Sequence, residues 1–153
     1  MFVIRKTCAA LLILGASAAI APAAEPVANP LIGGWEAQHY YLKDGHDYPL
    51  QGQILFTRKN FLVVYIVVVD GKPQRGSGEG GDYTVDGTGR VTFIHHYIAS
   101  TLAEGVPGLK PQQQRSLREE PPVVEASRFE IKGDQMTLFM PSGNRLTWTR
   151  SSD

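Results

Sequence analysis

The sequence predicts an all-β protein, an eight-stranded antiparallel up-and-down barrel with one loop-fringed mouth. Three observations lead to this fold. Segments rich in Val, Ile, Thr, Tyr and Phe recur between turn sequences along most of the chain. The connections alternate in length, so hairpin turns gather at one end of the barrel and long loops at the other. A Gly33-Gly34-Trp35 opening and a Trp148-x-Arg150 ending suit the sealed end of a small barrel.

The first 23 residues have the pattern of a secretory signal peptide. Arg5 and Lys6 precede an apolar stretch, 8–20, that is too short to span a bilayer. An Ala-x-Ala motif ends at Ala23, which predicts cleavage after that residue. We therefore expect a periplasmic or secreted protein with no membrane-spanning segment after cleavage.

The remaining chain has the size of one domain. Residues 24–30 form an extended, proline-bearing lead-in, and 31–151 form the barrel. Cys8, the only cysteine, is lost with the signal, so we expect neither a disulfide nor a thiolate metal ligand. The chain has 15 basic and 15 acidic residues and no remaining Lys/Arg cluster, which argues against binding of nucleic acid or an anionic membrane.

Eight strands are expected to follow one another in the chain. They cover residues 34–42, 52–57, 61–69, 81–86, 90–97, 123–132, 135–140 and 144–150. Tight turns join three pairs, at 58–60, 87–89 and 133–134, whereas 43–51, 70–80 and 98–122 are long loops. Within the longest loop, only 99–105 has the composition of a short helix. The glycine-rich stretch 76–81 precedes a strand rather than a helix, so we interpret it as a flexible loop and not a phosphate site.

Strand parity assigns faces in this barrel, because successive side chains point to opposite sides. Placing Trp35 inside also places Ala37, His39 and Tyr41 inside. The first strand begins at the sealed end and the last strand finishes there. Arg150 is therefore expected to lie over the indole face of Trp35, in a closed end that also includes Gly33 and Trp148.

The same parity rule predicts a polar mouth that binds the ligand. It consists of His39, Tyr41, His95, Tyr97 and Glu125, lidded by residues 98–122. A one-residue shift or bulge would exchange His95 for His96. Below this mouth we expect a mainly apolar lumen, with Trp35, Ala37, Tyr83, Val85, Phe93, Phe129, Ile131, Met136, Leu138 and Trp148 facing inward.

We assign no metal, cofactor or catalytic residue. The adjacent His95 and His96 point to opposite faces of a regular strand, so they cannot enter one metal site together. Glu125, His39 and Tyr41 could supply acid–base chemistry if they meet in a dry lumen. We favour a polar rim on a carrier pocket instead. The sequence also has no G-x-S-x-G motif, and no cysteine nucleophile remains after removal of the signal.

Residues 61–69 are apolar on both faces, although a barrel strand normally has one wet face. One interpretation is a partly covered strand. The other is that the outer face of this strand packs against a second copy of the chain, giving a homodimer. The sequence leaves both open.

The motifs, in their order and spacing, resemble the bacterial lipocalin-like domain family. The resemblance covers most of 31–150 and rests on Leu31-Ile32-Gly33-Gly34-Trp35, Tyr48-Pro49-Leu50, Asp82-Tyr83-Thr84-Val85, His95-His96, Arg128-Phe129-Glu130, Gly133-Asp134-x-x-Thr137-Leu138 and Leu146-x-Trp148-x-Arg150. It implies an antiparallel barrel that encloses a pocket, but no single activity.

Three functional hypotheses follow. The first is an exported barrel that binds a small hydrophobic or amphipathic molecule in its lumen. The second is a periplasmic protease inhibitor or interaction module that acts through its surface or through the segment 24–30. The third is a lumenal isomerase or cyclase. The shape of the lumen separates them, because a filled barrel favours the surface and an open cavity favours a ligand.

Overall fold

The protein is described by a computed structural model that covers residues 29–102, 106–109, 114–117 and 121–152. The predicted signal peptide and most of the lead-in 24–30 lie outside these residues. The described chain forms nine strands: β1 Gly33–Tyr41, β2 Asp47–Phe56, β3 Asn60–Val69, β4 Lys72–Val85, β5 Arg90–Leu102, β6 Gln114–Leu117, β7 Val123–Lys132, β8 Gln135–Phe139 and β9 Arg145–Arg150.

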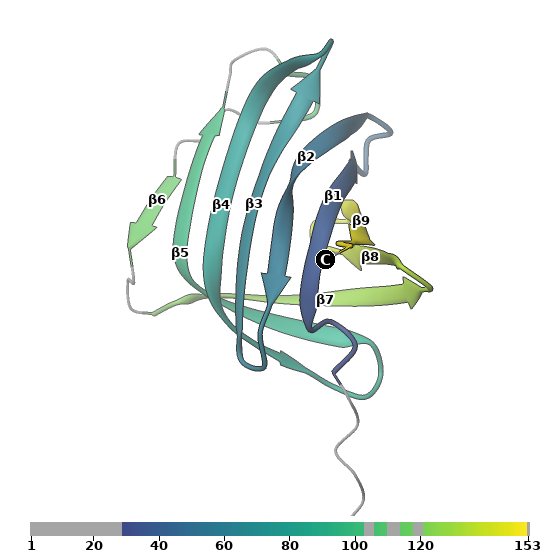
Figure 1. The fold of residues 1–153 in the computed structure, drawn as a ribbon. Coiled ribbons are helices and arrows are strands. Elements are labelled where there is room, and N and C mark those ends of the chain that lie inside the picture. Colours follow the sequence, from purple (N-terminus) through teal and green to yellow (C-terminus); the bar gives the residue numbers. More distant parts are fainter. Residues whose placement is uncertain (1–28, 103–105, 110–113, 118–120, 153) are drawn as a thin grey trace, which may run out of the picture.

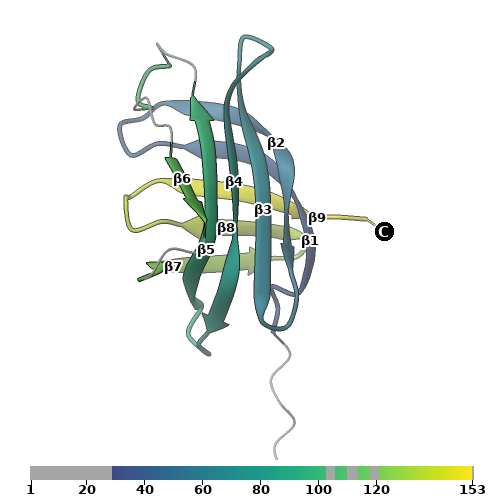
Figure 2. The ribbon, with the colours of Figure 1, turned by 90° about the vertical axis from the view of Figure 1, so that its left-hand side faces the viewer.

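Eight of these strands close into a barrel in which every pairing is antiparallel (Figures 1 and 2). Around the ring, β1 to β5 are neighbours in order, β5 pairs with β7, and β9 returns to β1. The predicted eight-stranded up-and-down barrel is therefore confirmed. The ninth strand, β6, pairs with the second half of β5, beyond the point where β7 leaves it.

Several boundaries differ from the expected ones. The predicted long loop 70–80 is wrong, because β3 and β4 are joined by a tight turn in which Asp70 and Gly71 both have positive φ. The glycine-rich stretch 76–81 belongs to β4, where it pairs with β3 on one side and β5 on the other. Two ladders offset the low strand propensity of glycine here.

The predicted helix at 99–105 is also wrong where it can be compared, because β5 continues to Leu102. Residues 103–105 lie outside the described chain. The expected lid 98–122 is thus partly strand, and β2 begins five residues earlier than expected, at Asp47. None of the described residues forms a helix long and apolar enough to cross a membrane.

The sealed end of the barrel is formed by the entry to β1 and the end of β9. Leu31 and Trp35 are completely buried there, and the Trp35 indole N–H donates a 2.8 Å hydrogen bond to the Leu31 carbonyl. The expected contact is present: the Arg150 guanidinium lies 4.1 Å from the Trp35 ring centroid. Arg150 also donates to the Ile32 and Pro30 carbonyls, at 3.2 and 3.1 Å.

Two irregularities in the ladders change which side chains face inward. In β1 the register shifts just before His39 against both neighbouring strands, after Glu36 in the ladder with β2 and after Ala37 in the ladder with β9. In β5 the shift lies at His96, because Gly80 pairs with Tyr97 and Gly81 with His95. A side chain at position 81 would collide with the Ile94 carbonyl, so glycine permits this close approach.

The loop-rich end is covered by an apolar cluster. After the β1 irregularity, Tyr40 and Leu42 are buried, and Tyr48 joins them from β2. The Tyr48 hydroxyl donates a 2.7 Å hydrogen bond to the Pro107 carbonyl, and Val106 and Leu109 are buried. The turn 106–109 thus packs on the barrel, in the region where a lid was expected.

Candidate functional site

The barrel encloses a small cavity of about 50 Å³ between the apolar layers at its two ends. Aromatic and aliphatic side chains make up most of its wall. These are Ile54, Phe61, Val63, Tyr65, Phe93, Leu138, Met140, Leu146 and Trp148. Three titratable side chains complete the lining: Glu79 from β4, His95 from β5 and Glu125 from β7.

Glu79 and His95 form a close pair at this cavity. Glu79 Oε2 lies 3.1 Å from His95 Nδ1, and its Oε1 accepts a 2.9 Å hydrogen bond from Ser77. Burial raises the pKa of Glu79, but the contacts with His95 and Ser77 and the charge of Arg75 outweigh it, so the pKa lies below its usual value. Glu79 is therefore ionised at neutral pH.

His95 is 8 % exposed and packs edge-on against Phe61, with ring centroids 5.3 Å apart. Although its Nδ1 lies near Glu79, the approach is not aligned as a hydrogen bond, and no other described group bonds to that nitrogen. With Nδ1 turned to a carboxylate, a neutral imidazole carries its lone pair on Nε2.

Glu125, in β7, has the same kind of serine partner as Glu79, but its serine follows the glutamate in the chain instead of preceding it. Its Oε1 accepts a 2.7 Å hydrogen bond from Ser127, two residues along the same strand. Glu125 stands opposite Phe93 in the β5–β7 ladder. Among the described residues it has no cationic partner, which distinguishes it from Glu79.

Two further polar groups are buried beside these carboxylates. Burial, with the negative charge of Glu79 second, raises the pKa of Tyr65 far above its usual value, so this hydroxyl is neutral. Trp148 is 1 % exposed, and its indole N–H has no hydrogen-bond partner in the described chain. A buried donor without a partner is costly, and such atoms are uncommon in folded proteins.

The structure places two of the predicted mouth residues, His95 and Glu125, on this cavity. His39 and Tyr41 do not reach it, so the expectation that they face inward is wrong. The β1 irregularity turns them outward, where their rings stack 4.9 Å apart. His39 lies 3.7 Å from Asp47, and the Arg145 guanidinium covers Tyr41 at 4.4 Å.

Tyr97 is likewise outside the barrel, with 49 % of its surface exposed, so its expected inward orientation is wrong. The β5 irregularity at His96 reverses the alternation beyond His95. His96 faces outward too, and its Nε2 lies 2.9 Å from Asp82. Of the two adjacent histidines, His95 is the interior one.

Sequence reasoning missed Glu79, Ser77 and Tyr65 as parts of the site. Glu79 and Ser77 fell within the stretch interpreted as a glycine loop. Their alternation with Gly76, Gly78 and Gly80 was the available signal, because polar residues at every second position indicate one face of a strand.

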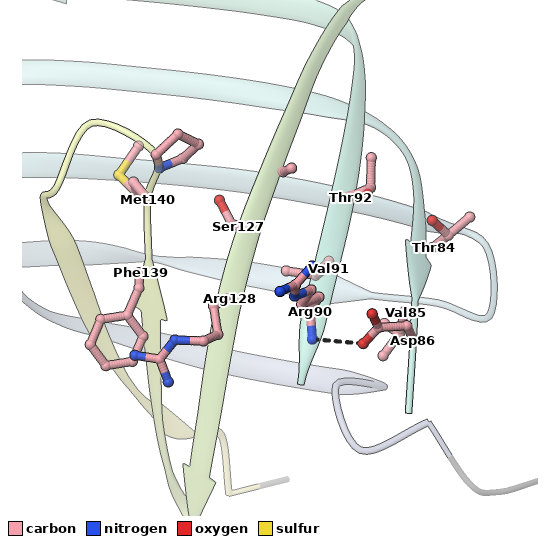
Figure 3. Close-up of a pocket in the computed structure, with 12 residues that line it drawn as sticks. Thr84, Val85, Asp86, Arg90, Val91, Thr92, Ser127, Arg128, Phe139 and Met140 are labelled. Carbon is pink, nitrogen blue, oxygen red and sulfur yellow. Dashed lines mark hydrogen bonds between the residues drawn. The ribbon is translucent and has the colours of Figure 1, made fainter. Parts of the chain in front are cut away.

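A more voluminous hollow lies on the surface. This groove, of about 630 Å³, lies at the end of β4 and the start of β5, beside β7 and the end of β8 (Figure 3). Its Arg128 covers Phe139 at 3.9 Å, and the Asp86 carboxylate accepts a 3.0 Å hydrogen bond from the Arg90 backbone. These charged groups are solvated and already partnered, so the smaller interior cavity has the stronger chemical case.

Two other findings bear on function, one about metal ligands and one about an apolar surface. Within the described residues, no group of three or more His, Cys, Asp or Glu side chains is placed to hold a metal ion. The outer face of β2 and β3 exposes Leu55, Leu62 and Val64, which are 50 %, 57 % and 53 % accessible. We call these three residues the outer apolar patch.

The arrangement of strands resembles that of a known protein. A lipocalin-like protein from Bacteroides uniformis ATCC 8492 superposes with a TM-score of 0.50, over 79 % of this chain and 98 % of that one. The fold is lipocalin-like. The two sequences are 15 % identical, so the likeness concerns the fold and not an activity or a ligand. No protein-family model and no curated protein matches the chain.

Proposed function

We propose that this lipocalin-like barrel binds a small organic molecule in its interior cavity. The apolar part of the ligand lies against the aromatic and aliphatic wall, and its polar group meets Glu79, His95 and Glu125. One observation carries the proposal: two carboxylates and a histidine line a cavity that is otherwise apolar, and the His95 Nδ1 and Trp148 N–H beside them have no hydrogen-bond partner in the described chain. Ligand sites characteristically combine an apolar wall with a few convergent polar groups.

The size of the cavity favours a small ligand. About 10–15 Å³ of such space is enough for one water, so 50 Å³ holds a few waters or a ligand head group. A longer ligand needs a side chain to move, and Met140, which is only partly buried, is the most adaptable member of the wall. Glu79 keeps 23 % of its side-chain exposure, which gives the acidic end of the cavity contact with solvent.

The barrel is largely filled, which by the criterion of lumen shape favours a function at the surface, but the described contacts give the alternatives less support. An isomerase or cyclase would use the same Glu79–His95 pair as acid and base, but nothing in the cavity identifies a reacting group. For an inhibitor acting through its N-terminal segment, the nearest described residues are held to the barrel: Asn29 donates to the Tyr83 hydroxyl at 2.8 Å, and Pro30 accepts from Arg150. Binding in the cavity is therefore the function we put forward.

Export also stays a proposal. The basic start, the apolar stretch and the Ala-x-Ala motif before Ala24 support it. The mass of the intact protein recovered from its cells tests it, and we expect a chain that starts at Ala24. A mature chain that starts before Ala21 would contradict the cleavage site.

NMR titration tests the binding proposal with a matched pair of adjacent histidines. A library of small amphipathic molecules is added to ¹⁵N-labelled protein, and we expect hits that shift the backbone amides of Glu79, His95 and Glu125. The variant His95→Gln should weaken these hits, whereas His96→Gln, on the outer face, should leave them unchanged. A library without hits, or hits that shift only outer-face amides in a folded protein, would refute the proposal.

A further inference from the structure

We infer that the cavity selects a small organic cation, an amine, and that Glu125 is its counter-ion. This inference rests on the proposed function, because it presumes that the cavity is where the ligand binds. It adds the chemical class of the ligand and the residue that decides that class.

The first argument is the charge of the lining. Among the described residues, the cavity wall carries two carboxylates, Glu79 and Glu125, and no Lys or Arg side chain. Arg75 lies four residues before Glu79 in β4 and lowers the pKa of Glu79 only through its charge. His95 is the single partner within the wall, and it faces Glu79. Within the described part of the chain, Glu125 is therefore left without a counter-charge.

The second argument is the way each carboxylate is held. Ser77 donates to Glu79, and Ser127 donates to Glu125, each from two residues away on the same strand. Each hydroxyl occupies Oε1 and leaves Oε2 available. In Glu79 that oxygen faces His95, whereas in Glu125 it has no described partner. Both carboxylate oxygens of Glu79 therefore have a partner, whereas only Oε1 of Glu125 has one among the described residues.

The third argument is the hydrogen-bonding capacity that stays open at the cavity. His95 is more than nine-tenths buried, and its Nδ1 makes no aligned hydrogen bond. The Trp148 N–H is buried without a partner. Buried atoms without a partner are uncommon in folded proteins, and a bound molecule would supply the missing contacts. The Glu125 carboxylate accepts hydrogen bonds, so it matches the N–H donors of an ammonium group, whereas the Trp148 N–H is a donor and is matched by an acceptor atom of the ligand or by water.

The aromatic wall favours the same class. Phe61, Phe93 and Trp148 line the cavity together with Glu125, and Phe61 and Phe93 meet edge to face at 4.8 Å. Aromatic faces attract cations through the ring quadrupole, and the attraction grows when the site excludes water. An anion would meet two carboxylates there and is disfavoured by charge.

Three probes that share a propyl or propionyl skeleton test the inference: propylammonium, 1-propanol and propionate. They are titrated by NMR at pH 7 into the intact protein. We expect propylammonium to bind at least about tenfold more tightly than 1-propanol, with propionate weakest. Glu125→Gln should reduce the preference for propylammonium to near unity while 1-propanol still binds. Glu130→Gln, which removes an exposed carboxylate from the same strand, should keep the preference.

The outcomes separate the two proposals. If 1-propanol or propionate binds in the cavity as tightly as propylammonium, the inference about charge fails and binding in the cavity stands. The same holds if Glu125→Gln and Glu130→Gln behave alike. If neither these probes nor any library molecule shifts the cavity amides, both proposals fail.

Discussion

The sealed end and the interior cavity treat their polar atoms in opposite ways. At the sealed end the Trp35 N–H reaches a carbonyl, and the Arg150 guanidinium combines two carbonyls with an aromatic face. At the cavity the Trp148 N–H has no described partner. Glu125 accepts a hydrogen bond from the Ser127 hydroxyl but has no cationic partner among the described residues. The difference teaches that two tryptophans in one core are held differently: the Trp35 N–H is paired within the fold, and the Trp148 N–H is left to the ligand that we propose.

The largest effect is expected at the sealed end. Trp35→Ala should lower the free energy of unfolding by about 3–5 kcal/mol, because it opens a cavity in a completely buried layer. Urea unfolding followed by far-UV circular dichroism measures it. Tyr97→Ala is the matched control, since it truncates an aromatic residue that is half exposed. A loss below about 1 kcal/mol for Trp35→Ala would show that the sealed end is not the stable half.

A smaller loss, with a distinct pH dependence, is expected for Glu79→Gln. The pKa of Glu79 is lowered in the folded state, so its charge stabilises the protein above the unfolded pKa, near 4.5, and this stability is lost as the pH falls through the folded pKa. At pH 7 the variant should lose about 1–3 kcal/mol.

Urea unfolding at a series of pH values measures this effect. The difference between wild type and Glu79→Gln should shrink as the pH falls from 5 toward 3. Glu36→Gln, on the exposed face of β1, should give a difference near zero throughout. A gap between wild type and Glu79→Gln that stays constant with pH would mean that the charge of Glu79 contributes nothing to the fold.

Arg150→Ala should cost about 1 kcal/mol, because part of its contact with Trp35 faces water. Arg145→Ala is its matched control, since that guanidinium also covers an aromatic ring, Tyr41, but on the outside of the barrel. Thermal unfolding should rank Arg150→Ala as the more damaging of the two. The reverse order would remove the distinction between a sealing contact and a surface contact.

The smallest stability effect belongs to the outer apolar patch. Leu62→Ser should change the free energy of unfolding by no more than about 0.5 kcal/mol, because the side chain is exposed. The proposal that a second copy packs on this face makes a separate prediction. Light scattering after size exclusion should then show a wild-type dimer and a monomeric variant. A monomeric wild type at high concentration would exclude the homodimer.

Parity along regular strands predicted the sealed end correctly, because no irregularity separates Trp35 from the start of β1 or Arg150 from Trp148. It failed for His39, Tyr41 and Tyr97, which follow the shifts in β1 and β5. A bulge adds one residue to one strand, and the position of that residue depends on how the strand fits against its neighbours. The period-two pattern of a single strand does not contain that information.

Glycine misled the interpretation in a different way. Gly76, Gly78 and Gly80 gave β4 the composition of a loop, although two neighbouring strands hold it extended. The site residues Ser77 and Glu79 were hidden within it. His95 was found because it continues the alternation of Val91 and Phe93, and Glu125 because it is in phase with Phe129 and Ile131 further along its strand.

The pairing of β1 with β9 has a consequence for how the chain folds. The first and last strands of the ring are partners, so closure joins segments from opposite ends of the described chain. Such distant contacts form late and slow the reaction, because a long loop must be ordered before they contribute. A chain truncated before Arg145 lacks the closing strand and leaves β1 and β8 as open edges, which invite pairing with other chains.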